Sequence, residues 1–181
     1  MAESRFATDF YKGKSVLITG HTGFKGTWMC CVLKELGANI TGYALRPPTT
    51  PNLFELTGIG KEICSIEGDI RDLEHLQKVF EQVKPEIVIH MAAQPIVRES
   101  YKNPVYTYDV NVMGTVNLLE ASRKSGVKRI VLASSAAVYG EIGGVELPLK
   151  EECEVRPLSF YGPTKLTGEN YLSMYQRNFG L

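Results

Sequence analysis

The sequence lacks an excess of either charge, because its 20 Lys and Arg residues are matched by 20 Asp and Glu residues. A chain without net charge has no overall attraction to nucleic acid or to an anionic membrane, so we expect neither as a partner. Apolar runs long enough to span a bilayer are also missing. The N-terminal residues Met1–Phe6 lack the apolar core of a signal peptide, and we therefore expect a cytoplasmic protein.

Metal-site spacing is equally absent. The cysteines form no Cys-x-x-Cys pair and no cluster with histidine, so we expect no bound metal; they are Cys30, Cys31, Cys64 and Cys153. Cys30 and Cys31 fall in an apolar helical stretch, where cysteine commonly packs as a reduced core residue. What the sequence does contain is 44% hydrophobic residues over 181 positions, which is enough for one domain with a full-sized core. No repeat or internal boundary divides residues 1–181.

Short apolar runs alternate with amphipathic stretches along the chain. Runs typical of buried parallel strands occupy residues 14–19, 39–44, 63–66, 86–90 and 128–134. Helical periodicity predicts helices over residues 24–36, 73–83, 104–124 and 160–178, with a surface loop at 141–157. Apolar residues repeat at helical spacing in the first helix (Trp28, Val32, Leu33, Leu36) and are expected to point inward in the third (Val105, Val112, Val116, Leu119). This alternation predicts an α/β fold, a doubly wound parallel sheet (Rossmann fold) with helices on both faces.

A glycine-rich loop, Gly20-His21-Thr22-Gly23-Phe24-Lys25-Gly26, follows the first predicted strand and opens the first helix. Glycines at such a point let the backbone turn sharply and approach a pyrophosphate, which rests on the helix N-terminus. The spacing differs from the commoner G-x-G-x-x-G, and a plain strand-to-helix turn is the alternative. We predict a dinucleotide site, with the following contacts in the loop: Gly20, Thr22, Gly23, Phe24 and Gly26.

Residues beyond the loop bear on the adenosine half of the cofactor. An acidic residue about 20 positions after such a loop commonly holds the ribose hydroxyls, but that count reaches Arg46, with no Asp or Glu nearby. Arg46 could pair with a 2′-phosphate and favour NADP, or be a solvated loop residue, so NAD and NADP both stay open. Asp69 and Ile70 follow the third strand, where Asp69 could accept a hydrogen bond from the adenine amino group. Its alternative role is a helix N-cap, for which Asp72 is the better candidate.

Three further residues are predicted to contact the cofactor. Ala92 and Ala93 follow the fourth strand, where small residues would let a cofactor pass close to the backbone; the neighbouring His90 is interpreted as a core histidine. Asn111 lies inside a predicted helix, although asparagine is a mediocre helix former. A cofactor contact explains it, and packing or solvent exposure is the alternative.

Tyr161 and Lys165 are four residues apart, so on a helix they share one face. An ammonium beside a phenol favours the phenolate, which would let tyrosine act as a base nearer neutrality. A lone Tyr-x-x-x-Lys is common by chance, but here a dinucleotide loop precedes it and the pair Ser134-Ser135 lies between. We therefore predict hydride chemistry on an alcohol, with Ser135, Tyr161 and Lys165 as catalytic residues. The alternative is that the serines only cap a strand end and the tyrosine only packs.

Together these motifs resemble the extended short-chain dehydrogenase/reductases that modify nucleotide sugars, the NAD-dependent epimerase/dehydratase family. Residues 1 to about 120 resemble the CDP-glucose 4,6-dehydratases, in the glycine-rich loop, in Gly42-Tyr-Ala-Leu45 and in His90-Met-Ala-Ala-Gln-Pro95. Residues from about 125 onward are similar to UDP-glucose 4-epimerases, in Ser134-Ser-Ala-Ala-Val-Tyr-Gly140 and Tyr161-Gly-Pro-Thr-Lys165.

The resemblance implies a role for each catalytic residue. Ser135 would hydrogen-bond the 4-hydroxyl of a nucleotide-diphosphate sugar, and Tyr161 would take its proton. Lys165 would lower the tyrosine pKa and hold the nicotinamide ribose, while hydride passes from C4 to NAD.

The reaction that follows depends on the residues after Ser135. A 4,6-dehydratase needs further acid/base groups there, to remove the C5 proton and expel the C6 hydroxyl. Ala136 and Ala137 occupy those positions, and a methyl group cannot move a proton. The sequence therefore favours 4-epimerase chemistry, with CDP-glucose 4,6-dehydratase as the alternative.

The resemblance also bears on length and assembly. Family members are much longer than this chain, so we expect a fragment that lacks most of the C-terminal substrate domain, and a cofactor-binding module without turnover is a further alternative. The family implies a homodimer through the 104–124 and 160–178 helices. Tyr171, Met174 and Tyr175 would supply an outer apolar stripe, or would instead cover the sheet.

Overall fold

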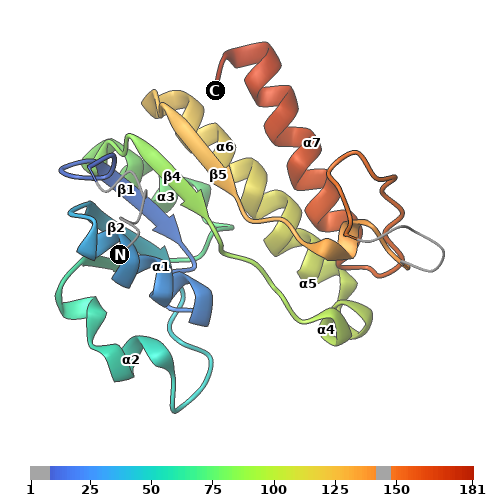
Figure 1. The fold of residues 1–181 in the computed structure, drawn as a ribbon, viewed down its shortest axis with the longest axis horizontal. Coiled ribbons are helices and arrows are strands. Elements are labelled where there is room, and N and C mark those ends of the chain that lie inside the picture. Colours follow the sequence, from blue (N-terminus) through green and yellow to red (C-terminus); the bar gives the residue numbers. More distant parts are fainter. Residues whose placement is uncertain (1–8, 142–147) are drawn as a thin grey trace, which may run out of the picture.

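The computed structural model describes residues 9–141 and 148–181, so the expectation for Met1–Phe6 and the middle of the predicted 141–157 loop lie outside the described residues. One sheet of five strands, all paired in parallel, runs through the centre of the molecule in the order β3-β2-β1-β4-β5 (Figure 1). The strands are β1 (Ser15–Thr19), β2 (Asn39–Ala44), β3 (Cys64–Glu67), β4 (Ile87–His90) and β5 (Arg129–Leu132). The predicted doubly wound parallel sheet is confirmed.

Helices lie on both faces of this sheet (Figure 1). The α-helices are α1 (Phe24–Glu35), α2 (Leu53–Thr57), α3 (Leu73–Val83), α4 (Val97–Lys102), α5 (Pro104–Tyr108), α6 (Gly114–Ser125) and α7 (Gly162–Phe179). Short 3-10 turns at Ile59–Lys61 and Ala136–Val138, together with α2 and α4, are additions that helical periodicity did not predict, because segments this short carry less than two turns of pattern.

Side chains alternate along the strands, so the sheet has an apolar core on each face. Leu17 of β1 pairs in register with Val88 of β4, and both belong to a core with Phe80 of α3 and residues of α6. Their neighbours Val16 and Ile87 belong to the second core, which α1 covers. A strand buried on both faces reads as a continuous apolar run, which is why the sequence located these strands to within about one residue.

The buried face of α1 differs from the expected apolar stripe. Trp28 and Val32 are 52% and 53% exposed, whereas the residues facing the sheet include Gly26, Thr27 and Cys30. Small residues on this face let the start of the helix approach the backbone of the glycine-rich loop. Apolar spacing therefore located the helix correctly, but of the four spaced residues only Leu33 is fully buried and Leu36 packs partly against the core.

The predicted 104–124 helix contains a π-helical turn, Asp109–Met113, between α5 and α6. A π turn inserts an extra residue, so positions spaced at 3.6 residues before and after it no longer share a face. Leu119 is buried as expected, but Val105 is 78% exposed, and the expectation that it points inward is wrong. Val110 and Asn111, inside the turn, are buried in its place.

Helix α7 packs against α6, the π turn and the edge strand β5. Pro163 lies in its first turn, and it ends at Gly180, whose φ of 70° suits a left-handed cap. Tyr171 and Met174 are exposed, but Tyr175 is half-buried and donates a hydrogen bond of 2.6 Å to Glu120 of α6. Tyr175 therefore belongs to the contact between α6 and α7, which corrects its expected place in an outer stripe. No helix within residues 9–141 and 148–181 is long and apolar enough to cross a membrane.

Candidate functional site

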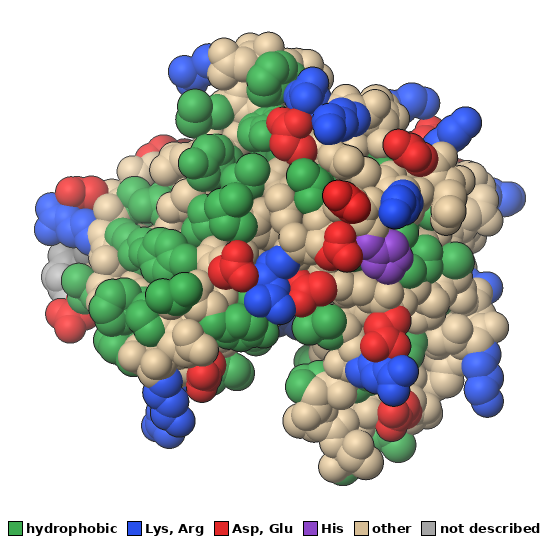
Figure 2. Space-filling model, turned by 180° about the vertical axis from the view of Figure 1, so that it is seen from behind, with side chains coloured by type: hydrophobic (Ala, Val, Ile, Leu, Met, Phe, Trp, Pro, Cys, Tyr) green, Lys and Arg blue, Asp and Glu red, His purple; other side chains and the backbone are tan. Residues whose placement is uncertain are grey.

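A cavity of about 680 Å³ opens at the carboxyl ends of the strands. It lies where β1 separates the β2 side of the sheet from the β4 side, the crevice in which open α/β sheets bind ligands. Figure 2 shows the surface hollowed between two halves of the molecule. The lining includes Gly20, Thr22, Gly23, Phe24, Gly26, Arg46, Asp69, Ile70, Ala92, Ala93, Tyr161 and Lys165. All the predicted site residues except Asn111 and Ser135 are therefore brought together around one space.

The glycine-rich loop is packed too tightly for a side chain at two of its glycines, Gly20 and Gly26. Gly20 has a φ of 75°, and a Cβ there would lie 2.7 Å from the backbone nitrogen of Ala92. A Cβ on Gly26 would lie 2.1 Å from the carbonyl oxygen of Gly20. No side chain caps the N-terminus of α1, which begins immediately after Gly23. Its first backbone N–H groups are therefore suited to an anion such as a pyrophosphate.

Arg46 is already paired with an acidic residue. Its Nε donates a hydrogen bond of 2.8 Å to Glu67, which stands at the end of β3, and both side chains are more than half exposed. The bond to Glu67 raises the pKa of Arg46. A 2′-phosphate at this position would have to share the guanidinium with that carboxylate.

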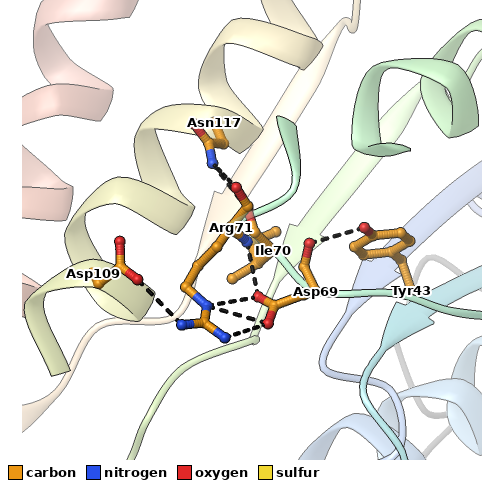
Figure 3. Close-up of polar contacts among 6 residues, drawn as sticks. All are labelled: Tyr43, Asp69, Ile70, Arg71, Asp109 and Asn117. Atoms are coloured by element: carbon orange, nitrogen blue, oxygen red, sulfur yellow. Dashed lines mark hydrogen bonds and ion pairs between the residues drawn. The ribbon is translucent and has the colours of Figure 1, made fainter. Parts of the chain in front are cut away.

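Asp69 is held by an arginine two residues further along the chain (Figure 3). Its carboxylate accepts hydrogen bonds of 2.6 Å from Nη2 and 2.9 Å from the backbone nitrogen of Arg71, and the guanidinium reaches Asp109 at 3.2 Å. These bonds lower the pKa of Asp69 against the opposing effect of its partial burial. Tyr43 donates to the Asp69 carbonyl at 2.9 Å. Helix α3 is capped by Asp72 instead, as expected.

Asn111 lies behind the cavity wall. Its side chain is 3% exposed and bonds to the backbone of Gln94 and to the hydroxyl of Thr164. It is not among the lining residues. The structure therefore shows Asn111 packed and excludes its exposure to solvent, and its contact with the cofactor stays a prediction.

Tyr161 and Lys165 both face the cavity, from the start and first turn of α7. Burial raises the pKa of Tyr161, and a hydrogen bond with the Ser135 side chain partly offsets this. Burial lowers the pKa of Lys165, against an opposing effect of Glu169. In the structure without cofactor, burial of the phenol thus has the larger effect on the pKa of Tyr161, and the role of Lys165 in lowering it stays a prediction.

Of the two adjacent serines, Ser134 lines the cavity and Ser135 does not. The Ser135 hydroxyl accepts a hydrogen bond of 3.2 Å from the backbone nitrogen of Ala137 and so caps the 3-10 turn. Ser134 bonds to Glu169 of α7. The serine that lines the cavity thus lies one position before the predicted one, although Ser135 remains close enough to interact with Tyr161.

Several lining residues escaped prediction. Met91 and Gln94 belong to the segment after β4, and the strand-end rule that selected Ala92 and Ala93 could have found them. Tyr106 and Val110 come from α5 and the π turn, and no local pattern signals them. Among the residues that the structure describes, no group of three or more His, Cys, Asp or Glu could hold a metal ion.

Comparisons with known proteins agree with this geometry. Residues 17–181 match the family model described as GDP-mannose 4,6 dehydratase. The chain is 51% identical over 132 residues to a CDP-glucose 4,6-dehydratase of Salmonella typhimurium, an alignment covering 72% of this chain and 37% of that protein. It is 42% identical over 168 residues to a proposed UDP-glucose 4-epimerase of Methanocaldococcus jannaschii, covering 92% and 52%.

A solved structure shows the same arrangement. The UDP-glucose 4-epimerase of Brucella ovis in complex with NAD superposes with a TM-score of 0.83 at 32% identity, over 93% of this chain and 50% of that one. The chain thus spans about a third to a half of the length of these relatives. The chain belongs to the GDP-mannose 4,6 dehydratase family, within the extended short-chain dehydrogenase/reductases.

Proposed function

We propose that residues 1–181 form the NAD-binding domain of a nucleotide-sugar 4-epimerase, and that Tyr161 takes the proton of the sugar 4-hydroxyl. The observation that carries this proposal is that Tyr161, Lys165 and the glycine-rich loop line one cavity. Bound NAD would supply the acceptor for the hydride that leaves C4. The buried Lys165 ammonium would stabilise the phenolate and hold ribose hydroxyls, and Ser134 or Ser135 would orient the sugar hydroxyl.

The lining of the cavity favours epimerase over dehydratase chemistry. Within the described residues, Asp69 is the single carboxylate of the lining, and Arg71 binds it. Ala136 and Ala137 form the 3-10 turn after Ser135 and provide no acid or base. Oxidation at C4 and return of the hydride to the opposite face needs no further proton transfer at C5, so the groups present suffice.

A CDP-glucose 4,6-dehydratase is the second candidate, because the Salmonella relative is 51% identical over 132 residues. Residues at the reacting carbon bear more directly on the reaction than overall identity, so we rank it below the epimerase. A module that binds the cofactor without turnover is the third, since relatives extend well beyond the matched region.

As cofactor we propose NAD rather than NADP. The paired Arg46 supports this choice, because Glu67 would repel a 2′-phosphate while it occupies the guanidinium. The Brucella structure contains NAD.

Product analysis tests the function. A form of the protein as long as its relatives is first titrated with NAD and NADP and then incubated with UDP-glucose or CDP-glucose. We expect binding of NAD and formation of the C4 epimer, detected by NMR. Tyr161→Phe should lower turnover by at least about a hundredfold, the usual contribution of a general base, while NAD still binds. A 4-keto-6-deoxy product, recognised by its absorbance in alkali, would contradict the epimerase; NAD binding without any product would support the binding module.

We further propose a homodimer through α5, α6 and α7. Figure 2 shows hydrophobic side chains gathered over the half of the molecule that these helices form. Met113 of the π turn and Met174 of α7 are 50% and 55% exposed. A mass measurement in solution should give twice the mass of the chain, and Met174→Glu should give the monomer mass. Val32→Glu on α1, at an equally exposed apolar residue, serves as the control, and a monomeric parent chain would refute the dimer.

A further inference from the structure

A series of buried polar side chains links the end of β1 to the backbone of Tyr161. Its members are Thr19, His90, Thr115, Asn111 and Thr164, and each is 3% exposed or less. We call this series the buried polar chain. Its members come from β1, β4, α6, the π turn and α7, so it crosses the molecule from the cofactor loop to the helix of the proposed base.

Only one assignment of donors and acceptors satisfies the hydrogen bonds in the first half of the buried polar chain. The Thr19 hydroxyl accepts from the backbone nitrogens of Met91 and Ala92, each at 3.2 Å, so it donates its own hydrogen to His90 Nδ1 at 2.6 Å. His90 must then carry its hydrogen on Nε2, which donates to the Thr115 hydroxyl at 3.1 Å. Thr115 in turn donates to the carbonyl of Asn111 at 2.6 Å.

The second half of the chain runs through the Asn111 amide. Its oxygen accepts from the backbone nitrogen of Gln94 at 2.7 Å, and its nitrogen donates to the Gln94 carbonyl and, at 3.0 Å, to the Thr164 hydroxyl. Thr164 then donates to the carbonyl of Tyr161 at 2.7 Å. The buried polar chain thus ends on Tyr161, which faces the cavity. At its other end it is bonded to Ala92, another lining residue.

A buried polar group without a partner costs more than its hydrogen bond contributes, so a network of this kind holds one arrangement strongly. Burial keeps His90 neutral by lowering its pKa to about 3, which preserves the single hydrogen pattern near neutrality. The Asn111 carbonyl accepts from Thr115, and its side-chain amide donates to Thr164. The two halves of the buried polar chain therefore join at Asn111, in the π turn.

We propose that Thr164 is a positioning residue, which through Asn111 fixes Tyr161 and Lys165 relative to the cofactor loop. The catalytic meaning of this position rests on the proposed function, but the mechanical link does not. Thr167 offers a matched control: its hydroxyl donates to the Pro163 carbonyl at 2.8 Å, one turn further along the same helix, outside the buried polar chain.

The test compares Thr164→Val, Thr164→Ser and Thr167→Val. Valine keeps the shape of threonine and removes the hydroxyl, whereas serine keeps the hydroxyl. Hydrogen exchange is followed at the Gln94 amide, bonded to Asn111, and at the Ala92 amide, bonded to Thr19. For Thr164→Val we expect exchange about fivefold faster at Gln94 and about twofold faster at Ala92, the scale of one lost hydrogen bond. NAD should bind about fivefold more weakly.

Thr164→Ser should restore parental exchange and affinity, and Thr167→Val should leave both unchanged. Equal effects of Thr164→Val and Thr167→Val would overturn the proposal, and so would a serine variant that behaves like valine, because packing rather than the hydroxyl would then be responsible. Faster exchange with unchanged NAD affinity would also overturn it. If the parent chain binds no NAD, the proposed function fails. The link between Thr164 and the cofactor loop is then judged only by whether Thr164→Val speeds hydrogen exchange at the Ala92 amide.

Discussion

Alanine at Gly26 should abolish NAD binding and destabilise the fold by about 3 kcal/mol, the upper end of the usual cost of atoms forced into a packed interior. The added Cβ would lie 2.1 Å from the Gly20 oxygen and 2.8 Å from the Cα of His21. Both neighbours are backbone atoms of the loop that has to receive the pyrophosphate. They cannot move without opening the turn, so stability and binding are lost together. Urea denaturation and calorimetric titration with NAD measure the two effects.

Gly23→Ala provides the control within the same loop. Its Cβ would meet a single atom, the Gly20 oxygen, at 3.3 Å, and its φ of −75° is open to any residue. We expect this variant to stay within about 1 kcal/mol of the parent in stability. A Gly26→Ala chain with the parental midpoint and affinity would show that the loop is looser than the structure describes.

Acid should destabilise the protein before most of its carboxylates are protonated. Burial lowers the pKa of His21 to about 4 and that of His90 to about 3, from an ordinary value near about 6.5. The folded state therefore binds fewer protons than the unfolded state, and stability falls as pH drops below the ordinary value. At pH 4.5 each histidine should cost about 2–3 kcal/mol. Together they approach the total stability of a typical domain, about 5–15 kcal/mol.

Urea midpoints between pH 7 and pH 4.5 test this expectation. Asp69, whose pKa is lowered by Arg71, loses its contribution only as pH falls below the ordinary carboxyl value near about 4, outside the window. His90→Asn, although less stable at pH 7, should lose about half of the pH dependence. Midpoints that stay level down to pH 4.5 would mean that both imidazoles reach solvent.

The sequence predicted the sheet well, but it predicted the buried faces of α1 and of the start of the 104–124 helix less well, for physical reasons. Strands buried on both sides need apolar residues at every position, so their pattern is local. The inner face of α1 is set by how closely Gly26 approaches Gly20, a contact between backbones that apolar spacing does not reveal. The π turn changes which residues of the helix face the core, and no residue type in Asp109–Met113 predicts such a turn.

The candidate site shows the same division. Glycines and the Tyr161–Lys165 pair were found because their chemistry requires those residue types at fixed spacing. Asn111 was chosen for its poor helix propensity, and the explanation is a set of partners distant in sequence, Gln94 and Thr164. Ser134 and Ser135 differ in which one faces the cavity, and only the geometry of the turn that follows separates them.

The central position of β1 determines when, during folding, the site comes into existence. Its two neighbours are β2, which follows after one helix, and β4, whose register joins Val16 to Ile87. The β1–α1–β2 unit, whose strands are parallel, provides only one wall of the cavity. Ala92 comes to lie beside Gly20 only after the long segment between them has folded. Distant pairings of this kind form late and slowly. A ligand of this cavity therefore binds only molecules in which the sheet is complete. By mass action it shifts the equilibrium from partly folded states to the folded state.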